Sequence, residues 1–179
     1  RYGRRQRQMC IRDRPTHWCF CFDSSEPTER HIEYSQYKAQ RDSMPEGISE
    51  AIPYIFKILE AMNIPVLSMP GYEADDIIGT VAKKAAKENY MVYMMTPDKD
   101  FAQLVSKNIN IYKPAFKGTS PQILGVLEVK KKFEIEKVSQ VIDYLGMTGD
   151  ASDNIPGIPG VGDKTCLLYT SPSPRDTNP

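Results

Sequence analysis

The amino-acid sequence predicts an α/β fold, in which helices cover both faces of a mostly parallel central sheet. Short apolar runs typical of strands alternate with longer segments whose apolar residues recur every three or four positions. The spacing of strand, helix and strand over residues 64–95 is that of a βαβ unit, whose two strands run parallel. The chain has 179 residues, 40% of them hydrophobic, which suffices for one domain with its own core.

In the first part of the chain, each element follows from its local pattern. Residues 18–22 form an apolar, aromatic-rich run that predicts a buried strand ending at Asp23, and ligand sites favour such strand ends. Residues 24–47 are polar and lack a hydrophobic period, which predicts a long excursion over the surface. Over residues 48–62 the apolar positions recur at helical spacing, so we expect an amphipathic helix with Pro53 in its first turns.

The later elements are predicted from the same kinds of signal. We expect strands at 64–69, 90–95 and 109–112, a turn at 70–71, helices at 73–88, 126–133 and 138–145, a hairpin around Lys117 and Gly118, and a glycine-rich loop after the last helix. In a βαβ arrangement, the ends of the strands at 18–22 and 90–95 lie at the same edge of the sheet.

Both ends of the chain look foreign to this domain. Residues 4–13 back-translate into a transposon-based sequencing adapter, and residues 166–170 into the reverse complement of part of it. We therefore expect residues 1–14 and 166–179 to be disordered, adapter-like sequence, and residues 15–165 to be the native part. The alternative is a natural basic N-terminal arm that binds nucleic acid, with a Ser/Pro-rich tail at the other end.

Composition and charge narrow the classes of function. The formal net charge is zero, which by itself disfavours a nucleic-acid partner, but carboxylates and lysines gather in separate stretches and cancel in the sum. No stretch approaches the run of about 18 apolar residues that spans a bilayer. The four cysteines do not have the spacing of a disulfide framework. We expect a cytoplasmic protein without membrane contact.

A set of carboxylates is the strongest chemical signal in the chain: Asp23, Glu73, Asp75, Asp76, Asp98, Asp100, Asp150 and Asp153. Singly, each has an ordinary explanation, such as helix capping or turn formation. Gathered at one sheet edge, they would repel one another strongly unless divalent cations supplied the compensating charge. Oxygen ligands suit Mg²⁺ or Mn²⁺, and two or more such ions would promote phosphodiester hydrolysis.

Three ordered motifs, at residues 71–80, 96–105 and 149–157, resemble the signature blocks of a known family. This is the five-prime nuclease domain found at the N-terminus of bacterial DNA polymerase I, which is related to flap endonucleases. The resemblance spans nearly all of the native part. It implies a PIN-like, five-prime nuclease fold with a helical arch at about 24–47 and a truncated helix-hairpin-helix that starts within about 150–165.

The resemblance also implies roles for individual residues. Asp23, Glu73, Asp75 and Asp76 would hold the first metal ion, and Asp98, Asp100, Asp150 and Asp153 would hold or surround the second. Lys38 and Arg41 would act catalytically on the scissile phosphate, or else belong to a solvated arm. The implied DNA-binding residues are Arg30, His31, Tyr34, Tyr37, Lys38, Arg41, Gly157, Gly160, Val161, Gly162 and Lys164, with K⁺ as a further ligand of the helix-hairpin-helix. Tyr34 and Tyr37 would stack on the unpaired strand or anchor the arch.

The function implied by the resemblance is that of a Mg²⁺-dependent, structure-specific 5'-3' exonuclease and flap endonuclease of DNA polymerase I. It would act as a monomer on DNA with five-prime flaps or ends and on RNA primers paired with DNA, in primer removal and DNA repair. The family's domain begins with another strand that carries a further metal-binding Asp, which nothing before Pro15 supplies, so we expect impaired activity. The alternatives are a non-catalytic module that binds branched or duplex DNA, and a topoisomerase-primase type of Mg²⁺ enzyme that needs only Glu73, Asp98 and Asp100.

Overall fold

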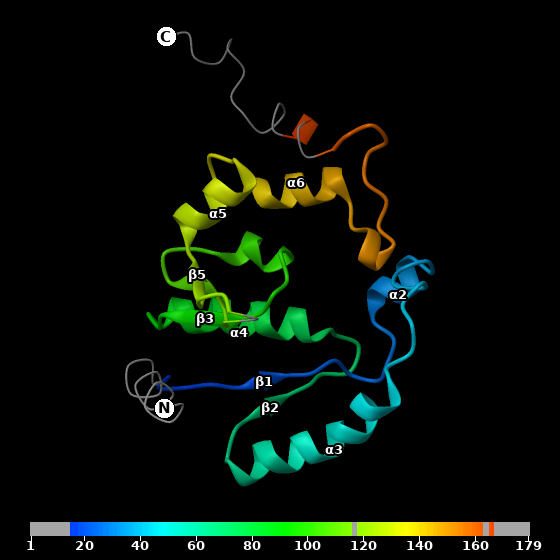
Figure 1. Ribbon diagram of the computed structural model, residues 1–179, viewed down its shortest axis with the longest axis vertical. Helices are drawn as coiled ribbons and strands as arrows, with labels where there is room; N and C mark the ends of the chain where they lie inside the picture. Colours follow the sequence, from blue (N-terminus) through cyan, green and yellow to red (C-terminus); the bar gives the residue numbers. More distant parts are fainter. Residues whose placement is uncertain (1–14, 116–117, 163–164, 167–179) are drawn as a thin grey trace.

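The computed structural model describes residues 15–115, 118–162 and 165–166. The helices and strands along these residues are β1 (Phe20–Cys21), α2 (Glu29–Glu33), α3 (Glu46–Ala61), β2 (Val66–Leu67), α4 (Ala74–Lys87), β3 (Val92–Met95), the 3₁₀ helix η1 (Asp100–Leu104), β4 (Ile109–Lys113), β5 (Gln122–Leu124), α5 (Val126–Phe133), α6 (Gln140–Thr148) and the 3₁₀ helix η2 (Ala151–Asp153). Figure 1 shows α3 at one end of the molecule and α5 with α6 at the other, with the strands and α4 between them.

The strands form two small sheets where the sequence predicted one central sheet. β1 pairs in parallel with β2, while β3 pairs in parallel with β4, which pairs antiparallel with β5. Helix α4 connects β2 to β3 and contacts both β1 and β3, so it links the two sheets. Among the described residues, no strand pairs β1 with β3. The α/β class and the parallel pairing are therefore confirmed, and the division into two sheets is the difference.

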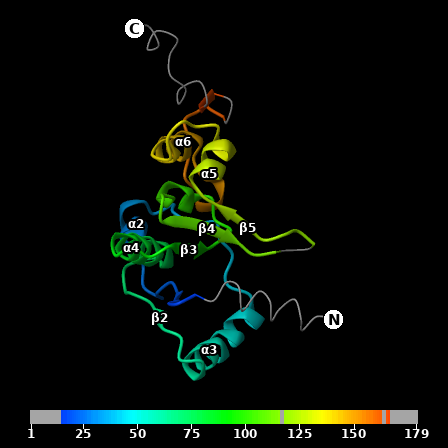
Figure 2. The same cartoon turned by 90° about the vertical axis from the view of Figure 1, so that its left-hand side faces the viewer.

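The hydrophobic core lies between the three-stranded sheet and helices α4, α5 and α6. Ile111 of β4, Val129 of α5 and Val141 of α6 are each at most 2% exposed. The helix predicted at 126–133 begins and ends at those residues, because Gly125 precedes it and Glu134 ends it with a left-handed backbone (φ 51°). The hairpin predicted around Lys117 and Gly118 is formed by β4 and β5, which project from the side of the molecule (Figure 2). Its residue Lys117 lies outside the described part.

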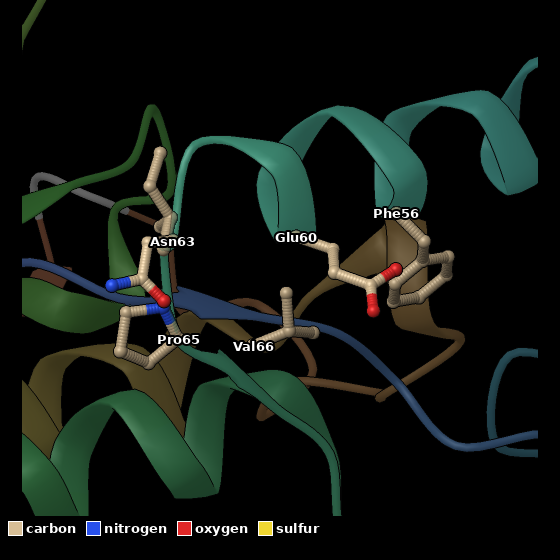
Figure 3. Close-up of a pocket in the computed structure, with 6 residues that line it drawn as sticks. Phe56, Glu60, Asn63, Pro65 and Val66 are labelled. Atoms are coloured by element: carbon tan, nitrogen blue, oxygen red, sulfur yellow. The ribbon is translucent and has the colours of Figure 1, made fainter.

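Helix α3 is the least buried of the longer helices. It begins at Glu46, two residues before the predicted start, and therefore contains Pro53 in its third turn and not in its first turns. Only Leu59 of this helix is buried, and Phe56 packs against Phe22, the residue after β1, at 4.7 Å between ring centroids. A cavity of about 420 Å³ opens between α3 and β2 (Figure 3), and none of the eight carboxylates predicted as metal ligands lines it.

The polar segment at 24–47 is more ordered than the sequence suggested. It contains the short helix α2, and the side chains of Thr28 and Tyr37 are buried at 5% and 7% exposure. No helix in the described residues is long and apolar enough to cross a membrane. Of the residues predicted to be adapter-like, 1–14 and 167–179 lie outside the described part, whereas Cys166, the first residue of the second segment, is described and buried.

Candidate active site

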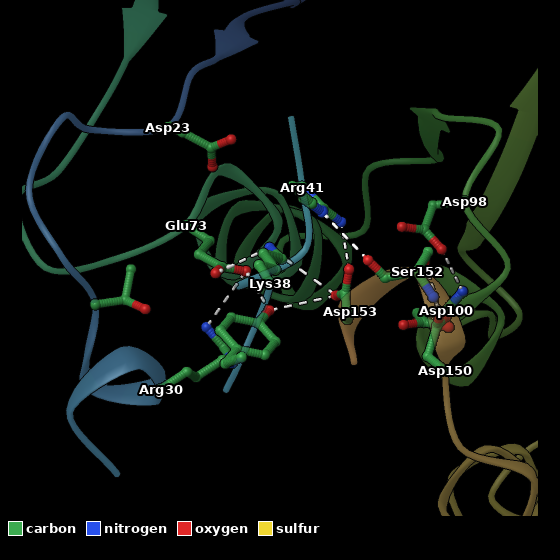
Figure 4. Close-up of polar contacts among 12 residues, drawn as sticks. Asp23, Arg30, Lys38, Arg41, Glu73, Asp98, Asp100, Asp150, Ser152 and Asp153 are labelled. Atoms are coloured by element: carbon green, nitrogen blue, oxygen red, sulfur yellow. Dashed lines mark hydrogen bonds and ion pairs between the residues drawn. The ribbon is translucent and has the colours of Figure 1, made fainter. Parts of the chain in front are cut away.

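The eight carboxylates predicted from the sequence come from four places in the fold, most of them labelled in Figure 4. Asp23 follows β1, and Glu73, Asp75 and Asp76 lie at the start of α4. Asp98 and Asp100 follow β3. Asp150 immediately precedes η2, and Asp153 is the last residue of η2. These segments are far apart in the sequence, and the fold brings their ends to one region of the surface.

The start of α4 fixes the first group of carboxylates. Glu73 is the residue before the helix, with an extended backbone, and its own amide donates to the Asp76 carboxylate at 3.2 Å. The amide of Ala74 donates to the carboxylate of Asp23 at 2.7 Å, which ties the end of β1 to the helix. Acidic side chains here are also favoured by the helix dipole. Helix capping is therefore one real role of these carboxylates, and it positions them together.

The pKa values of two aspartates show that the groups interact. Burial, and after it the negative charges of Asp98 and Asp23, raise the pKa of Asp75 from its ordinary 3.8 to about 6. The pKa of Asp100 is also raised, first by burial and then by Asp98. In the described part of the chain, no lysine or arginine forms an ion pair with Asp75, Asp98 or Asp100. Such a set of repelling carboxylates has the donor chemistry of a divalent cation site.

The other carboxylates are paired with basic residues of the segment 28–41. Arg30 makes two hydrogen bonds of 2.7 Å to the two oxygens of Asp76, and these bonds lower the pKa of that carboxyl group. Lys38 Nζ lies 3.0 Å from Glu73 Oε1 and 4.0 Å from Asp153 Oδ2. Arg41 forms an ion pair with the same Asp153. The three predicted basic residues thus lie directly over the acidic group (Figure 4).

Tyr37 is the buried centre of this contact. Its hydroxyl donates to Glu73 Oε2 at 3.2 Å and lies 3.4 Å from Asp153 Oδ2, while its ring packs on His31 at 5.2 Å between centroids. Lys38 has a left-handed backbone with φ 55°, which a residue with a Cβ adopts only when its surroundings hold it. Hydrogen bonds to Tyr37 and Glu73 raise the pKa of Lys38 and outweigh the opposing effect of burial. Of the two roles predicted for Tyr37, anchoring is the one that this geometry supports.

The same segment is held to the loop around η2 through backbone atoms. The amide of Lys38 donates to the carbonyl of Asp153 at 3.0 Å, and the side chain of Asn154 donates to the carbonyl of Gln36 at 2.9 Å. Tyr34 donates through its hydroxyl to the carbonyl of Asn154 at 3.1 Å. These bonds show that residues 34–41 and 150–154 form one structural unit.

The glycine-rich loop follows η2. Gly149, with φ 69°, packs so closely on Gly157 that a Cβ on Gly149 would overlap the backbone of Gly157. The amide of Val161 donates to the carbonyl of Ile158 at 3.0 Å and closes a turn at Gly160. This amide is therefore not free to bind a phosphate, although the resemblance implied that Val161 binds DNA. Gly162 accepts from the amides of residues 165 and 166 at 2.9 and 3.0 Å. Lys164, predicted to bind DNA, lies outside the described residues.

As the side chains stand, no three His, Cys, Asp or Glu residues of the described part are grouped tightly enough to hold a metal ion. Three of the carboxylates are turned toward basic side chains: Asp76 toward Arg30, Glu73 toward Lys38 and Asp153 toward Arg41. These basic groups supply the positive charge that a bound cation would otherwise provide. The acidic side chains therefore fit a divalent cation by their chemistry and by their shared location, while their present orientation satisfies the basic residues.

Sequence reasoning missed one charged residue at this site. Lys99 stands between Asp98 and Asp100 in the sequence, and its Nζ lies 3.2 Å from Asp150 Oδ2. The pKa of Asp150 is lowered, first by the hydrogen bond from Ser152 and also by Lys99. The signal that could have shown this is the alternation of charge in residues 98–100, which places a cation inside an acidic motif.

Comparison with known proteins gives a consistent result. Residues 5–134 match the family model of the 5'-3' exonuclease N-terminal resolvase-like domain, and residues 136–169 match that of the 5'-3' exonuclease C-terminal SAM fold. The chain is 39% identical over 156 residues to a 5'-3' exonuclease of Aquifex aeolicus, covering 87% of this chain and 52% of the relative. It is 43% identical over 150 residues to DNA polymerase I of Borreliella burgdorferi, covering 84% of this chain and 16% of that protein.

Among solved structures, the fold is similar to that of the bacteriophage T5 flap endonuclease, crystallised as a pseudo-enzyme–product complex with DNA and metal ions. The TM-score is 0.72 at 19% sequence identity, and the alignment covers 93% of this chain and 64% of the other. This similarity supports the five-prime nuclease fold that the motifs implied. The chain spans about half the length, or less, of the curated relatives named above.

Proposed function

The chain belongs to the 5'-3' exonuclease family, and from that premise we propose that its parent protein cleaves DNA as a structure-specific 5'-3' exonuclease and flap endonuclease of the DNA polymerase I type. The observation that carries the proposal is the gathering of acidic side chains from four separate segments beneath Arg30, Lys38 and Arg41. Primer removal and DNA repair, with RNA primers and five-prime-ended DNA as substrates, are the wider role that we assign to it.

The acidic residues would bind Mg²⁺, with Mn²⁺ as a substitute, because all eight assigned ligands offer carboxylate oxygens, which favour hard cations. We assign Asp23, Glu73, Asp75 and Asp76 to the first site and Asp98, Asp100, Asp150 and Asp153 to the second. When bound, the cations would lower the pKa of the attacking water and stabilise the leaving oxygen. The raised pKa values of Asp75 and Asp100 support this assignment, since a cation relieves the repulsion that raises them.

Lys38 and Arg41 would contact the scissile phosphate. In the present geometry they neutralise Glu73 and Asp153, so positive charge brought by metal ions would release them toward a substrate. Their ammonium and guanidinium groups would then hold the negative charge that builds on the phosphate during hydrolysis. Arg30 and Tyr37 would keep the segment in place over α4, through Asp76 and Glu73 respectively.

The remaining assignments concern the wider surface. We assign residues 24–47 to the arch that admits the unpaired strand, with His31 and Tyr34 as further DNA contacts, and residues 150–165 to the start of a helix-hairpin-helix. In the latter, Gly157, Gly160 and Gly162 would allow the backbone to approach the duplex, with K⁺ as a bridging ion. We also assign the protein to the cytoplasm and expect it to act on DNA as a monomer.

The test is cleavage of a labelled five-prime-flap DNA by the protein in Mg²⁺ and in EDTA, beside Asp75→Ala. Mg²⁺-dependent cleavage that Asp75→Ala abolishes would support the proposal. Because Glu73, Asp76 and Asp153 are occupied by basic residues, a second candidate is a module that binds branched DNA without cutting it. Flap binding without cleavage, in Mg²⁺ and in Mn²⁺, would favour that second candidate.

A further inference from the structure

Three lysines from separate elements surround a small cleft next to the candidate active site. Lys99 immediately precedes η1, Lys113 ends β4, and Lys132 lies in the last turn of α5. All three line one cleft with a volume of about 10 Å³, room for about one water molecule, whose floor is formed by apolar side chains such as Val129 and Phe133. Asp98 also lines it and forms its border with the acidic group.

The contacts of the three lysines leave positive charge concentrated at this cleft. Lys99 is paired with Asp150, and Lys113 donates to the carbonyl of Pro97 at 3.3 Å, which is a neutral partner. Lys132 lies over the ring of Phe133 at 5.2 Å and, within the described residues, forms no ion pair. Burial lowers the pKa of Lys132, and the charges of Lys113 and Lys99 lower it further.

Like charges that converge on one cleft oppose one another, and an anion in the cleft would remove that cost. Lys113 is anchored at the end of β4 by its hydrogen bond, and Lys132 of α5 is restrained by its contact with an aromatic ring. Both ammonium groups are therefore pre-positioned. A cleft that holds one water cannot enclose an organic molecule, but a phosphate oxygen can enter while the rest of the group stays outside.

We propose that Lys99, Lys113 and Lys132 form a phosphate-binding cleft that holds a phosphodiester group of the nucleic-acid backbone next to the bond that is cleaved. This rests on the proposed function, which places the reacting phosphate at the carboxylates. We choose the DNA backbone as the ligand because the cleft lies next to the carboxylates: Lys99 stands between Asp98 and Asp100 in the sequence and contacts Asp150. A strand whose scissile phosphate lies at the acidic group would carry a neighbouring phosphate past these lysines.

The experiment measures binding of a labelled five-prime-flap DNA by fluorescence anisotropy in EDTA, from 50 to 200 mM KCl, so that no cleavage occurs. Lys113→Gln/Lys132→Gln is compared with Lys107→Gln/Lys131→Gln, which removes the same charge from the residues before β4 and from α5, but outside the cleft. Each phosphate contact contributes about 0.9 to the slope of log K against log salt concentration. We expect the cleft variant to have a slope smaller by about 0.9, equivalent to about 8-fold weaker binding at 0.1 M salt, and the control to keep the wild-type slope.

Lys113→Arg/Lys132→Arg should restore the slope, and circular dichroism should show that all variants are folded. A folded Gln variant with the wild-type slope would overturn the phosphate cleft, and so would an equal loss of slope in the control. Failure of the proposed function has a different signature, because a wild-type protein that binds flap DNA but does not cut it in Mg²⁺ leaves the slope comparison intact. Wild-type protein without measurable DNA binding would overturn both.

Discussion

Replacing Asp75 by Asn should stabilise the metal-free protein and remove much of its stabilisation by metal. The pKa of Asp75 is raised from 3.8 to about 6 by burial and by its acidic neighbours, so its charged form is disfavoured in the folded state. Between about pH 4 and pH 6, the folded state holds more protons than the unfolded state, and stability therefore falls as pH rises through this range. Above pH 6 the full cost of the charge is present.

The size of the effect follows from the same pKa. A shift of this size in a fully buried group would correspond to about 3 kcal/mol. Asp75 is only partly buried and keeps contact with water, which screens its charge, so we expect about 1 kcal/mol. For a chain of this length, that raises the melting temperature by about 2–4 °C. Asp75→Asn should therefore melt higher than wild type at pH 7.5 in EDTA, and at the wild-type temperature at pH 4.

Differential scanning fluorimetry in EDTA and in 10 mM Mg²⁺, at pH 4, 6 and 7.5, measures both parts of this prediction. Asp143→Asn, which removes an exposed carboxylate on α6, is the matched control and should show neither change. The reasoning would be refuted if Asp75→Asn melted below wild type at pH 7.5 in EDTA, if its advantage persisted at pH 4, or if Mg²⁺ stabilised it as strongly as wild type.

Three further changes test other parts of the structure. Lys38→Met removes the closer of the two ion pairs of Glu73 and leaves the one with Arg30 at 3.7 Å, so calorimetry should show tighter Mn²⁺ binding. Flap cleavage should fall by about 100-fold or more because the phosphate loses a contact. Weaker Mn²⁺ binding would argue against the competition between Lys38 and the cation. Gly149→Ala places a Cβ against the backbone of Gly157, at a position with a left-handed backbone. Urea denaturation should show that the free energy of unfolding falls by more than about 2 kcal/mol. A fall below about 0.5 kcal/mol would mean that this close approach is not required. Ile111→Ala, in the buried face of β4, should cost about 3 kcal/mol by the same assay, and a smaller cost than for an exposed alanine substitution such as Leu127→Ala would contradict the described core.

The fold was predictable wherever local patterns decide the structure. Helices α4 and α5 begin and end within a residue of their predicted limits, because capping residues and helical periodicity agree in both segments. Strands β1, β2 and β3 are shorter than predicted, above all β1 and β2 with two residues each, because pairing depends on neighbouring strands that the local pattern does not reveal. The division into two sheets has the same origin.

The candidate site was likewise predictable from the sequence only in part. The meeting of Asp75 with Asp98 and Asp23 follows from strand ends and a helix start, which the order of elements already indicates. The pairing of Arg30, Lys38 and Arg41 with acidic residues depends instead on the path of a polar segment that has no periodicity. Tyr37 shows the limit most clearly, since nothing in its sequence surroundings distinguishes a buried tyrosine from one exposed to bind DNA.

The contacts between residues 34–41 and 150–154 also set an order of events during synthesis. Tyr37 and Asp153 are 116 residues apart, and the bond from Asn154 to Gln36 spans 118. At about 5–20 residues per second, the ribosome needs about 6–23 s to make the partner of Tyr37 after Tyr37 itself. During most of that time Arg41 lacks the carboxylate of Asp153, with which it pairs in the folded protein. The nascent chain therefore completes its acidic site only when the last of the described elements has emerged.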